Sequence, residues 1–339
     1  MSLSTGERLV DAYDLVILDL DGVVYLIDHP IPGAAATISR LHAEGKSLAY
    51  ATNNASRRSS EVAELLTAMG VPARPAEVLT SAAAAAAVLA SRLPPGAPVL
   101  VVGAPALREE IEAAGLRPVR RANEAPVAVV QGYGPRVGWA ELAEACLAVR
   151  AGALWVATNT DRTLPSLRGP LPGNGALVAA LAAALDRGPD LVVGKPEPAL
   201  FAAAADRAGA RRPLVVGDRL DTDIEGARRA GMDSLLVLTG VTRPVDLLHA
   251  PASRRPTYVA VDLRGLLDAA VSVPVGAARD GIGGWRVDNL GGGLRLTGSG
   301  DVLDALRALC AATWSGQPIG TVSAGSAVAA AALRELGIG

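Results

Sequence analysis

The stretch Asp19-Leu20-Asp21-Gly22 follows directly on the apolar run Leu15–Leu18, so two carboxylates stand where a buried strand is expected to end. Burying an unpaired carboxylate is costly, and two of them side by side need a cation, a shared proton or a basic neighbour. Gly22 then allows the backbone to turn sharply and to approach a ligand closely. The same stretch is also typical of a plain strand-to-turn junction, in which Asp favours the turn. Three further motifs decide between a metal site and a simple turn.

The composition indicates a folded chain that is long for one core. Its 339 residues, half of them hydrophobic, predict two or three domains. A net charge of −2 and an aromatic content of 3% argue against a nucleic-acid partner. Cys146 and Cys310 have neither a metal-site spacing nor a disulfide framework and are interpreted as buried thiols. The stretch Met1–Val10 has no apolar signal region and no run reaches transmembrane length, so we expect a cytoplasmic protein with no membrane insertion.

Short apolar runs alternate with helical patterns, which predicts parallel βαβ units. The expected strands are Leu15–Leu18, Ser47–Ala51, Leu191–Val193, Pro213–Val216 and Ser234–Leu238, and the expected helices are Ala34–Ala43, Ser59–Met69, Pro198–Ala208 and Thr222–Ala230. The first four strands run into the polar motifs Asp19-Leu20-Asp21, Thr52-Asn53-Asn54, Gly194-Lys195-Pro196 and Gly217-Asp218-Arg219. Because ligands bind outside the carboxyl ends of parallel strands, we expect all four motifs at one edge of one sheet.

A second set of strands and helices interrupts the first between about Thr80 and Gly188. Its own alternation of elements predicts a separate α/β domain inserted into the first. After about Ser272 the sequence becomes glycine-rich, with a hairpin expected around Trp285 and helices expected at Asp301–Thr313 and Ala324–Leu336. We therefore expect a discontinuous catalytic core at 1–79 and 189–271, an inserted cap at 80–188 and an appendage at 272–339.

The four motifs supply the parts that phosphoryl transfer needs, which are charge neutralisation and positioning. Asp19 is the candidate nucleophile, since a carboxylate can form an aspartyl-phosphate. Asp21 is placed to protonate the leaving alkoxide and later to deprotonate the attacking water. These two residues form the predicted catalytic pair.

The remaining polar residues are candidates for binding. Thr52, Asn53 and Asn54 offer a hydroxyl and two amides to phosphoryl oxygens, and Lys195 offers a point cation. A Mg²⁺ site is expected from the carboxylates of Asp19 and Asp218 with the backbone carbonyl of Asp21. Asp223 is expected one layer further out, where it would hold a metal-bound water or orient Lys195.

In combination, these motifs resemble the haloacid dehalogenase (HAD) superfamily, and within it the branch with a large α/β cap inserted between the second and third motifs. The residues that carry the resemblance are Asp19–Tyr25, Thr52–Asn54, Gly194–Pro196 and Gly217–Ile224, with Pro172–Ala176 similar to the cap motif of that branch. The resemblance implies an α/β fold with a Rossmann-like parallel-sheet core, the inserted cap and a small α+β appendage. It also implies a Mg²⁺-dependent phosphatase whose partner is a small phosphorylated metabolite.

Two departures from the branch concern substrate choice. The chain has Asn159-Thr160-Asp161 where the branch has Asn-Pro-Asp, and Gly132-Tyr133-Gly134 where it has Gly-aromatic-Asp. Overall, the chain is most similar to bacterial glycerol 3-phosphate phosphatases that carry an extra C-terminal region, which implies glycerol 3-phosphate as the substrate. A phosphoglycolate, sugar or nucleotide phosphatase, and a binding protein with a relic site, are the alternatives.

The appendage leaves a further alternative open. The run Gln317-Pro318-Ile319-Gly320 begins an acetyl-CoA-binding pattern, but Val322 stands where Gly or Ala is needed. A bifunctional protein with an acetyltransferase-like tail is therefore one hypothesis. The favoured hypothesis is a packing or dimerisation element, which also allows a homo-oligomer.

Overall fold

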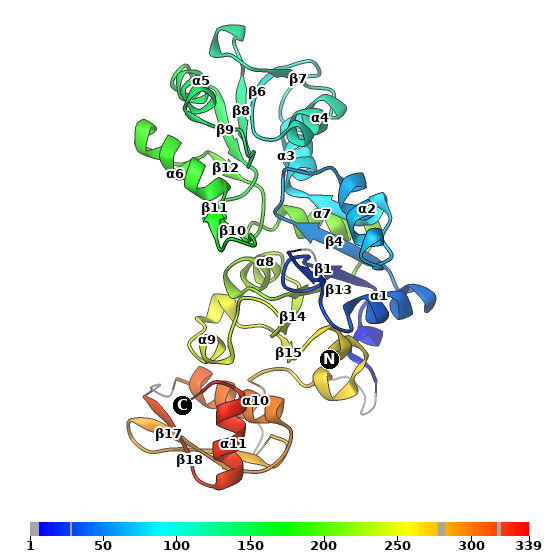
Figure 1. Ribbon diagram of the computed structural model, residues 1–339, viewed down its shortest axis with the longest axis vertical. Coiled ribbons are helices and arrows are strands. Elements are labelled where there is room, and N and C mark those ends of the chain that lie inside the picture. Colours follow the sequence, from blue (N-terminus) through cyan, green and yellow to red (C-terminus); the bar gives the residue numbers. More distant parts are fainter. Residues whose placement is uncertain (1–6, 28, 277–281, 317–319, 339) are drawn as a thin grey trace. The chain divides into compact units, whose positions relative to one another are not determined.

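The computed structural model describes residues 7–27, 29–276, 282–316 and 320–338. The chain divides into two compact units (Figure 1). The first comprises Met1–Leu26, Pro30–Lys46 and Arg211–Gly339, and the second comprises Ile27–His29 and Ser47–Ala210.

The first unit is built on parallel strands in the order β15-β14-β13-β1. Their bounds are Tyr258–Ala260, Asp233–Val237, Pro213–Gly217 and Leu15–Leu18, and the helices nearby are α1 (Ala34–Ala43), α8 (Glu225–Arg229) and α9 (Pro244–Leu248). All four residues of β1 are buried, as expected for a central strand with helices over both faces. The predicted strands of this unit are confirmed. Strand β15 is not among the predicted strands, because its three residues are too few to show a hydrophobic period in the sequence.

The second unit contains its own parallel sheet, in the order β12-β9-β8-β6-β7. Its strands are β6 (Pro98–Val102), β7 (Arg117–Val119), β8 (Ala128–Gln131), β9 (Leu154–Ala157) and β12 (Leu191–Val192). Alternate strand residues pack on α3 (Ser81–Ala90) and α4 (Pro105–Ala113) on one face, and on α5 (Trp139–Arg150) and α6 (Asn174–Leu185) on the other. The predicted inserted α/β pattern is thus present as a doubly wound sheet.

The remaining elements of the second unit are a parallel strand pair, a short ribbon and two helices. They are β4 (Leu48–Thr52), β5 (Val78–Thr80), β10 (Thr163–Leu164), β11 (Leu171–Pro172), α2 (Ser59–Ala68) and α7 (Ala199–Ala208). The chain also has two strands of two residues each, β2 (Tyr25–Leu26) and β3 (His29–Pro30).

One topological prediction is wrong. The strand before Lys195 is β12, and it pairs with β9 of the five-stranded sheet, Leu191 opposite Val156, rather than joining a sheet with β4. The four motifs therefore do not all follow strands of one sheet. Short apolar strands carry little information about which sheet they join, because their sequence specifies burial and not a partner.

A second difference lies after β13. A continuous helix is predicted at Thr222–Ala230, but the structure has a π-helical turn, Leu220–Ile224, that leads into α8. Gly217 permits this turn, because a Cβ at that position would overlap the side chain of Asp223. π-turns occur often at functional sites, and this one sets the position of Asp223.

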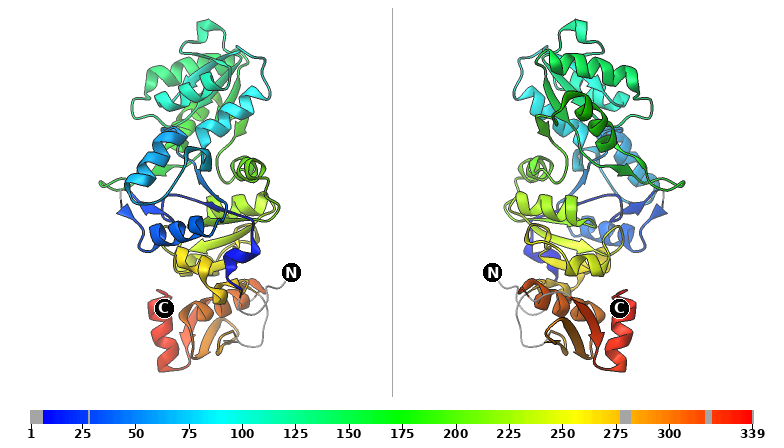
Figure 2. Two further views of the ribbon diagram at one scale, coloured as in Figure 1. Left: turned by 90° about the vertical axis from the view of Figure 1, so that its right-hand side faces the viewer. Right: turned by 90° about the vertical axis from the view of Figure 1, so that its left-hand side faces the viewer.

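The tail of the first unit forms a three-stranded sheet with two helices. Strands β16 (Trp285–Asn289) and β17 (Gly293–Gly298) make the predicted hairpin, and β18 (Thr321–Ala324), which was not predicted, pairs parallel with β17. Figure 2 shows the red helix α11 (Ala327–Glu335) alongside the orange strands of this sheet. Helix α11 begins later than predicted because the Oγ of Ser326 caps it by accepting from the Ala329 N–H.

The tail packs against the rest of the first unit through α10 (Val302–Trp314). Leu306, Leu309 and Cys310 are fully buried in a cluster that includes α9 and β15 residues. The indole N–H of Trp314 donates to the Leu247 carbonyl at 3.2 Å. The predicted burial of the tail helix against the main body is confirmed, and burial raises the pKa of the Cys310 thiol well above its usual range. Within the described ranges, no helix combines the length and the apolar character that a membrane span requires.

Candidate functional site

Three buried carboxylates meet in the first unit. Carboxylate oxygens of Asp19, Asp218 and Asp223 all lie within 4.8 Å of one another, and the three residues are 8%, 1% and 0% exposed. Asp19 directly follows β1 and Asp218 directly follows β13, the neighbouring parallel strand. The two motifs that the sequence placed at strand ends therefore converge, as the rule for parallel sheets predicts.

Backbone N–H groups orient two of these carboxylates. The N–H of Val241 donates to Asp218 Oδ2 at 2.6 Å, and the N–H of Arg219 donates to Asp223 Oδ2 at 3.1 Å. Gly22 has a φ of +83°, and a Cβ there would lie 2.6 Å from Asp218 Cγ. Gly22 is therefore required both for the left-handed turn and for the close approach of the Asp19 loop to Asp218.

The donor set of this cluster fits a hard divalent cation. Three carboxylates of like charge in a buried site repel one another unless a cation or protons compensate. Mg²⁺ takes oxygen ligands, with carboxylates and carbonyls among them. Asp21, the predicted acid–base group, is only half-buried, and its neighbour Gly22 donates its N–H to the Tyr25 carbonyl at 2.8 Å.

The other predicted site residues lie in the second unit, around the end of β4. Thr52, Asn53 and Lys195 are buried, with 3%, 9% and 3% of each residue exposed. Lys195 Nζ donates to the Ala51 carbonyl of β4 at 3.2 Å. Lys195 itself follows β12, which belongs to the five-stranded sheet, and β4 does not belong to that sheet. Thr52 Oγ1 accepts from the Asn54 N–H at 3.1 Å. The second and third motifs thus come together through β4 and β12.

Asn54 has a local structural task in addition to its predicted one. Its Oδ1 accepts from the Ser56 N–H at 2.8 Å and from the Ser56 Oγ at 2.7 Å. This arrangement is an Asx-type turn that fixes the loop after β4. The Asn54 amide nitrogen is the group of this side chain that suits a phosphoryl oxygen.

Sequence reasoning missed the residues that surround Asn53. The sequence predicts Asn159 and Asp161, which belong to the departure Asn159-Thr160-Asp161, near a specificity region. In the structure Asn159 Nδ2 donates to the Asn53 carbonyl at 2.7 Å, and Asn174 Nδ2 donates to the Asn159 carbonyl at 2.7 Å. Asn159 and Asn174 are 4% and 1% exposed. Their burial assigns them to a hydrogen-bonded framework, which only a contact map could have indicated.

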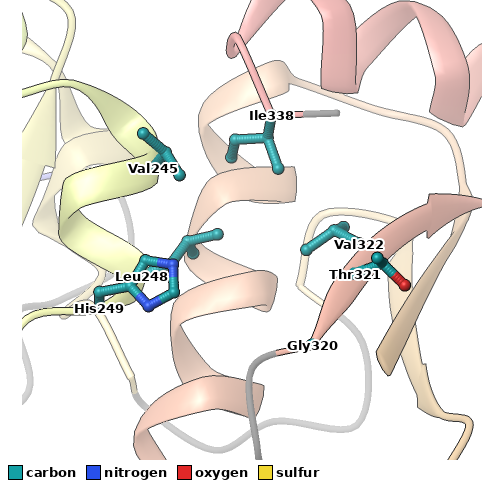
Figure 3. Close-up of a pocket in the computed structure, with 7 residues that line it drawn as sticks. All are labelled: Val245, Leu248, His249, Gly320, Thr321, Val322 and Ile338. Carbon is teal, nitrogen blue, oxygen red and sulfur yellow. The ribbon is translucent and has the colours of Figure 1, made fainter. Parts of the chain in front are cut away.

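A separate pocket lies in the tail region. It has a volume of about 290 Å³ and is lined by residues of α9, the segment around β18 and the C-terminal end, as Figure 3 shows: Val245, Leu248, His249, Gly320, Thr321, Val322 and Ile338. None of these residues belongs to the predicted phosphatase motifs. Of the acetyl-CoA-like pattern, Gln317, Pro318 and Ile319 lie outside the described residues, while the side chain of Val322 packs on the tail core.

Comparison with known proteins places this geometry in a family. Residues 16–117 match the model of haloacid dehalogenase-like hydrolases, and residues 192–266 match a second, HAD-hydrolase-like model. Together the two models span more than half of the chain. The chain belongs to the haloacid dehalogenase-like hydrolases. This HAD-type chain is an enzyme, a phosphoric monoester hydrolase, as its motifs predicted. Residues 282–338 match a GCN5-related N-acetyltransferase-like domain.

Individual relatives cover most of the chain. The D-glycerol 3-phosphate phosphatase of Mycobacterium tuberculosis (strain ATCC 25618 / H37Rv) is 46% identical over 317 residues, which are 91% of this chain and 88% of that protein. A crystal structure of the M. tuberculosis glycerol phosphate phosphatase in complex with magnesium matches with a TM-score of 0.91 and 47% identity, over 97% of this chain and 99% of that one. The acid sugar phosphatase of Staphylococcus aureus (strain USA300) is 37% identical over 74% of this chain and 95% of its own length.

Proposed function

We propose that this HAD hydrolase is a Mg²⁺-dependent phosphatase that hydrolyses glycerol 3-phosphate through an aspartyl-phosphate intermediate. The observation that carries the proposal is the buried cluster in which Asp19 and Asp218, at the ends of adjacent parallel strands, meet Asp223 of the π-helical turn. The choice of substrate is supported by the 46% identity to a D-glycerol 3-phosphate phosphatase over nearly the whole chain.

In this proposal the cation is held by the carboxylates of Asp19 and Asp218 and by the backbone carbonyl of Asp21. Asp223 is assigned to a metal-bound water, although its carboxylate lies close enough to the other two to be a ligand itself. When bound, the cation neutralises charge on the phosphoryl oxygens. The residues of the chain perform the remaining chemistry.

The proposed reaction has two covalent steps at Asp19. A carboxylate oxygen of Asp19 attacks phosphorus, the bond from phosphorus to the glycerol oxygen breaks, and Asp21 gives its proton to that oxygen. In the second step Asp21 takes a proton from water, the water oxygen attacks phosphorus, and Asp19 leaves as a carboxylate. The products are glycerol and inorganic phosphate, and Asp21 ends in its starting protonation state.

We assign phosphoryl binding to the loop Thr52-Asn53-Asn54 and to Lys195. Lys195 supplies a buried point cation whose position is fixed by the Ala51 carbonyl. We further propose that the inserted domain at 80–188 selects small substrates by closing over the site. The domain bounds stay predictions, with the core at 1–79 and 189–271 and the appendage at 272–339. The same holds for a homo-oligomer, for the absence of a nucleic-acid partner and for a cytoplasmic location.

A phosphate-release assay tests the proposal. The panel contains glycerol 3-phosphate, phosphoglycolate, a sugar phosphate, a nucleotide and a phosphopeptide, each with Mg²⁺ and with excess chelator. We expect glycerol 3-phosphate to have the highest kcat/KM, and chelator to abolish release. A higher kcat/KM on another small phosphoester would replace the substrate and leave the reaction type intact. Equal turnover of the phosphopeptide would contradict the proposed role of the cap.

The acetyltransferase-like tail has no catalytic part in this proposal. The match of residues 282–338 favours a shared fold, but Val322 interrupts the cofactor-binding pattern and packs on the tail core. Titration calorimetry with acetyl-CoA on the full chain checks this point. No saturable heat is expected, and saturable binding would make the bifunctional alternative the better one.

A further inference from the structure

We propose that Asn53 is a positioning residue, which holds Lys195 in place and links it to Asp161, and that its side chain does not itself bind phosphate. This inference rests on the proposed function, in which Lys195 binds the phosphoryl group, and it changes the role of one residue in the predicted phosphate-binding loop.

The Asn53 side chain clamps the main chain of Lys195. Its Oδ1 accepts from the Lys195 N–H at 2.8 Å, and its Nδ2 donates to the Lys195 carbonyl at 3.0 Å. The amide therefore pairs with both backbone groups of one residue, as a neighbouring strand would. Asn53 follows β4 and Lys195 follows β12, so the clamp joins the ends of two strands that belong to different sheets.

The hydrogen-bonding capacity of the amide leaves no donor for a substrate. A side-chain amide has two N–H donors. One N–H of Asn53 is used by the Lys195 carbonyl, and the other donates to Asp161 Oδ2 at 3.0 Å. A phosphoryl oxygen accepts hydrogen bonds and donates none unless protonated, so it has no complementary group on this side chain.

Other residues contact Asn53 at its main-chain carbonyl and beside its side-chain amide. The Asn53 carbonyl accepts from Ser81 Oγ at 2.6 Å and from Asn159 Nδ2 at 2.7 Å. On the other side, a Cβ on Gly194 would lie 2.5 Å from Asn53 Oδ1 and equally 2.5 Å from the Thr158 carbonyl oxygen. The residue before Lys195 must therefore lack a side chain for the amide to reach its partners.

Asp161 connects the clamp to the loop after β9. Its carboxylate accepts from the same Nδ2 that donates to Lys195, and its N–H donates to Asn159 Oδ1 at 3.2 Å. Because Asp161 and Lys195 share one amide nitrogen, a displacement of the β9 loop is transmitted to the Lys195 main chain. This coupling makes the placement of the Lys195 ammonium dependent on the inserted segment.

A double-mutant cycle between Asn53→Ala and Lys195→Ala tests the proposal. The readouts are kcat/KM for phosphate release and the affinity for inorganic phosphate in the presence of Mg²⁺, measured by titration calorimetry. If Asn53 acts through Lys195, we expect Asn53→Ala to lower kcat/KM by on the order of 10²-fold in the wild-type background and by less than about 3-fold in the Lys195→Ala background. Independent, multiplicative losses in both backgrounds would overturn the proposal.

Four further variants separate positioning from stability. Ser81→Ala removes a hydrogen bond from the Asn53 carbonyl and leaves the clamp intact, so we expect a lower melting temperature with kcat/KM within about 3-fold of wild type. Gly194→Ala should reproduce the kinetic defect of Asn53→Ala, and Asp161→Asn, which keeps an acceptor oxygen, should retain more activity than Asp161→Ala. A Ser81→Ala enzyme as impaired as Asn53→Ala, or a fully active Gly194→Ala enzyme, would contradict the clamp.

The outcomes also separate this inference from the proposed function. A wild-type protein that releases no phosphate from any substrate would overturn the proposed function. The clamp is then judged from the crystal structure of Asn53→Ala, in which a displaced Lys195 main chain supports it and an unmoved one overturns it.

Discussion

The carboxylate cluster and the amide clamp differ in what holds them. The carboxylates of Asp19, Asp218 and Asp223 meet within 4.8 Å of one another, where backbone N–H groups orient those of Asp218 and Asp223, and such an oxygen-rich arrangement would be stabilised further by a bound cation. Asn53 is held by hydrogen bonds to Asn159, Lys195 and Asp161, all of which are made within the protein and need no ligand. A bound cation should therefore change the stability of the cluster more than that of the clamp. Substitutions in the cluster should consequently change activity and the response to Mg²⁺, whereas those at the edge of the clamp should change stability regardless of Mg²⁺.

The largest effect is expected at Asp19. Asp19→Asn removes the nucleophile and should lower kcat by on the order of 10⁴–10⁶-fold. It also removes one of the carboxylates that would bind the cation, so the rise in melting temperature on adding Mg²⁺ should be smaller than in wild type. Phosphate release, and calorimetric melting with Mg²⁺ and with chelator, check both statements. An Asp19→Asn protein that gains as much stability from Mg²⁺ as wild type does would contradict the assignment of Asp19 to the cation.

A smaller loss is expected at Asp21, which lies beside the cluster and outside it. Asp21→Asn should lower kcat by about 10²–10⁴-fold, since both proton transfers lose their general acid–base group. Its side chain is not assigned to the cation, so the affinity for Mg²⁺ in titration calorimetry should change by less than about 3-fold. Normal single-turnover chemistry together with lost Mg²⁺ affinity would assign Asp21 to the metal instead.

On the clamp side, Asn159→Ala should act on stability. It removes the donor to the Asn53 carbonyl, which keeps the Ser81 hydroxyl as a partner. The loss of a buried amide that is 4% exposed should lower the free energy of unfolding by about 1–3 kcal/mol. Urea unfolding with and without Mg²⁺ measures this change in the free energy of unfolding, which should be the same in the two conditions. Full rescue by Mg²⁺ would mean that the two regions are not held differently.

The smallest effect is expected at a surface carboxylate of the first unit. Arg8 and Arg40 hold the pKa of Glu44 at about 2, below its usual value of 4.5. Because the folded-state pKa is lowered, the stability that Glu44 contributes is present above about pH 4.5 and is lost as the pH falls toward 2. The difference in urea midpoint between wild type and Glu44→Gln should therefore be small at pH 7 and should vanish near pH 2. A difference that grows on acidification would contradict this sign.

The meeting of Asp19 and Asp218 could be predicted from the sequence, whereas Asp223 was expected one layer further out. Asp19 and Asp218 each follow an apolar strand directly, and parallel strands bring such ends together. The clamp was not predictable, since Asn159 and Asp161 lie 106 and 108 residues from Asn53. Strand β12 shows the same limit, because two apolar residues do not specify which sheet they join. Polar groups at the ends of paired parallel strands can be placed from pattern, whereas the hydrogen bonds that loops make with one another follow only from the fold.

The central claim is that Asp19 carries the phosphoryl group during turnover. Rapid acid quenching followed by mass spectrometry of the digested enzyme tests it most directly, with glycerol 3-phosphate and Mg²⁺ added to wild type and to Asp19→Asn. We predict a phosphorylated peptide that contains Asp19 in the wild-type digest and no phosphorylated peptide from Asp19→Asn. Phosphate release by the wild-type enzyme with no modified Asp19 peptide at any quench time, or a phosphorylated peptide elsewhere in the chain, would contradict the account.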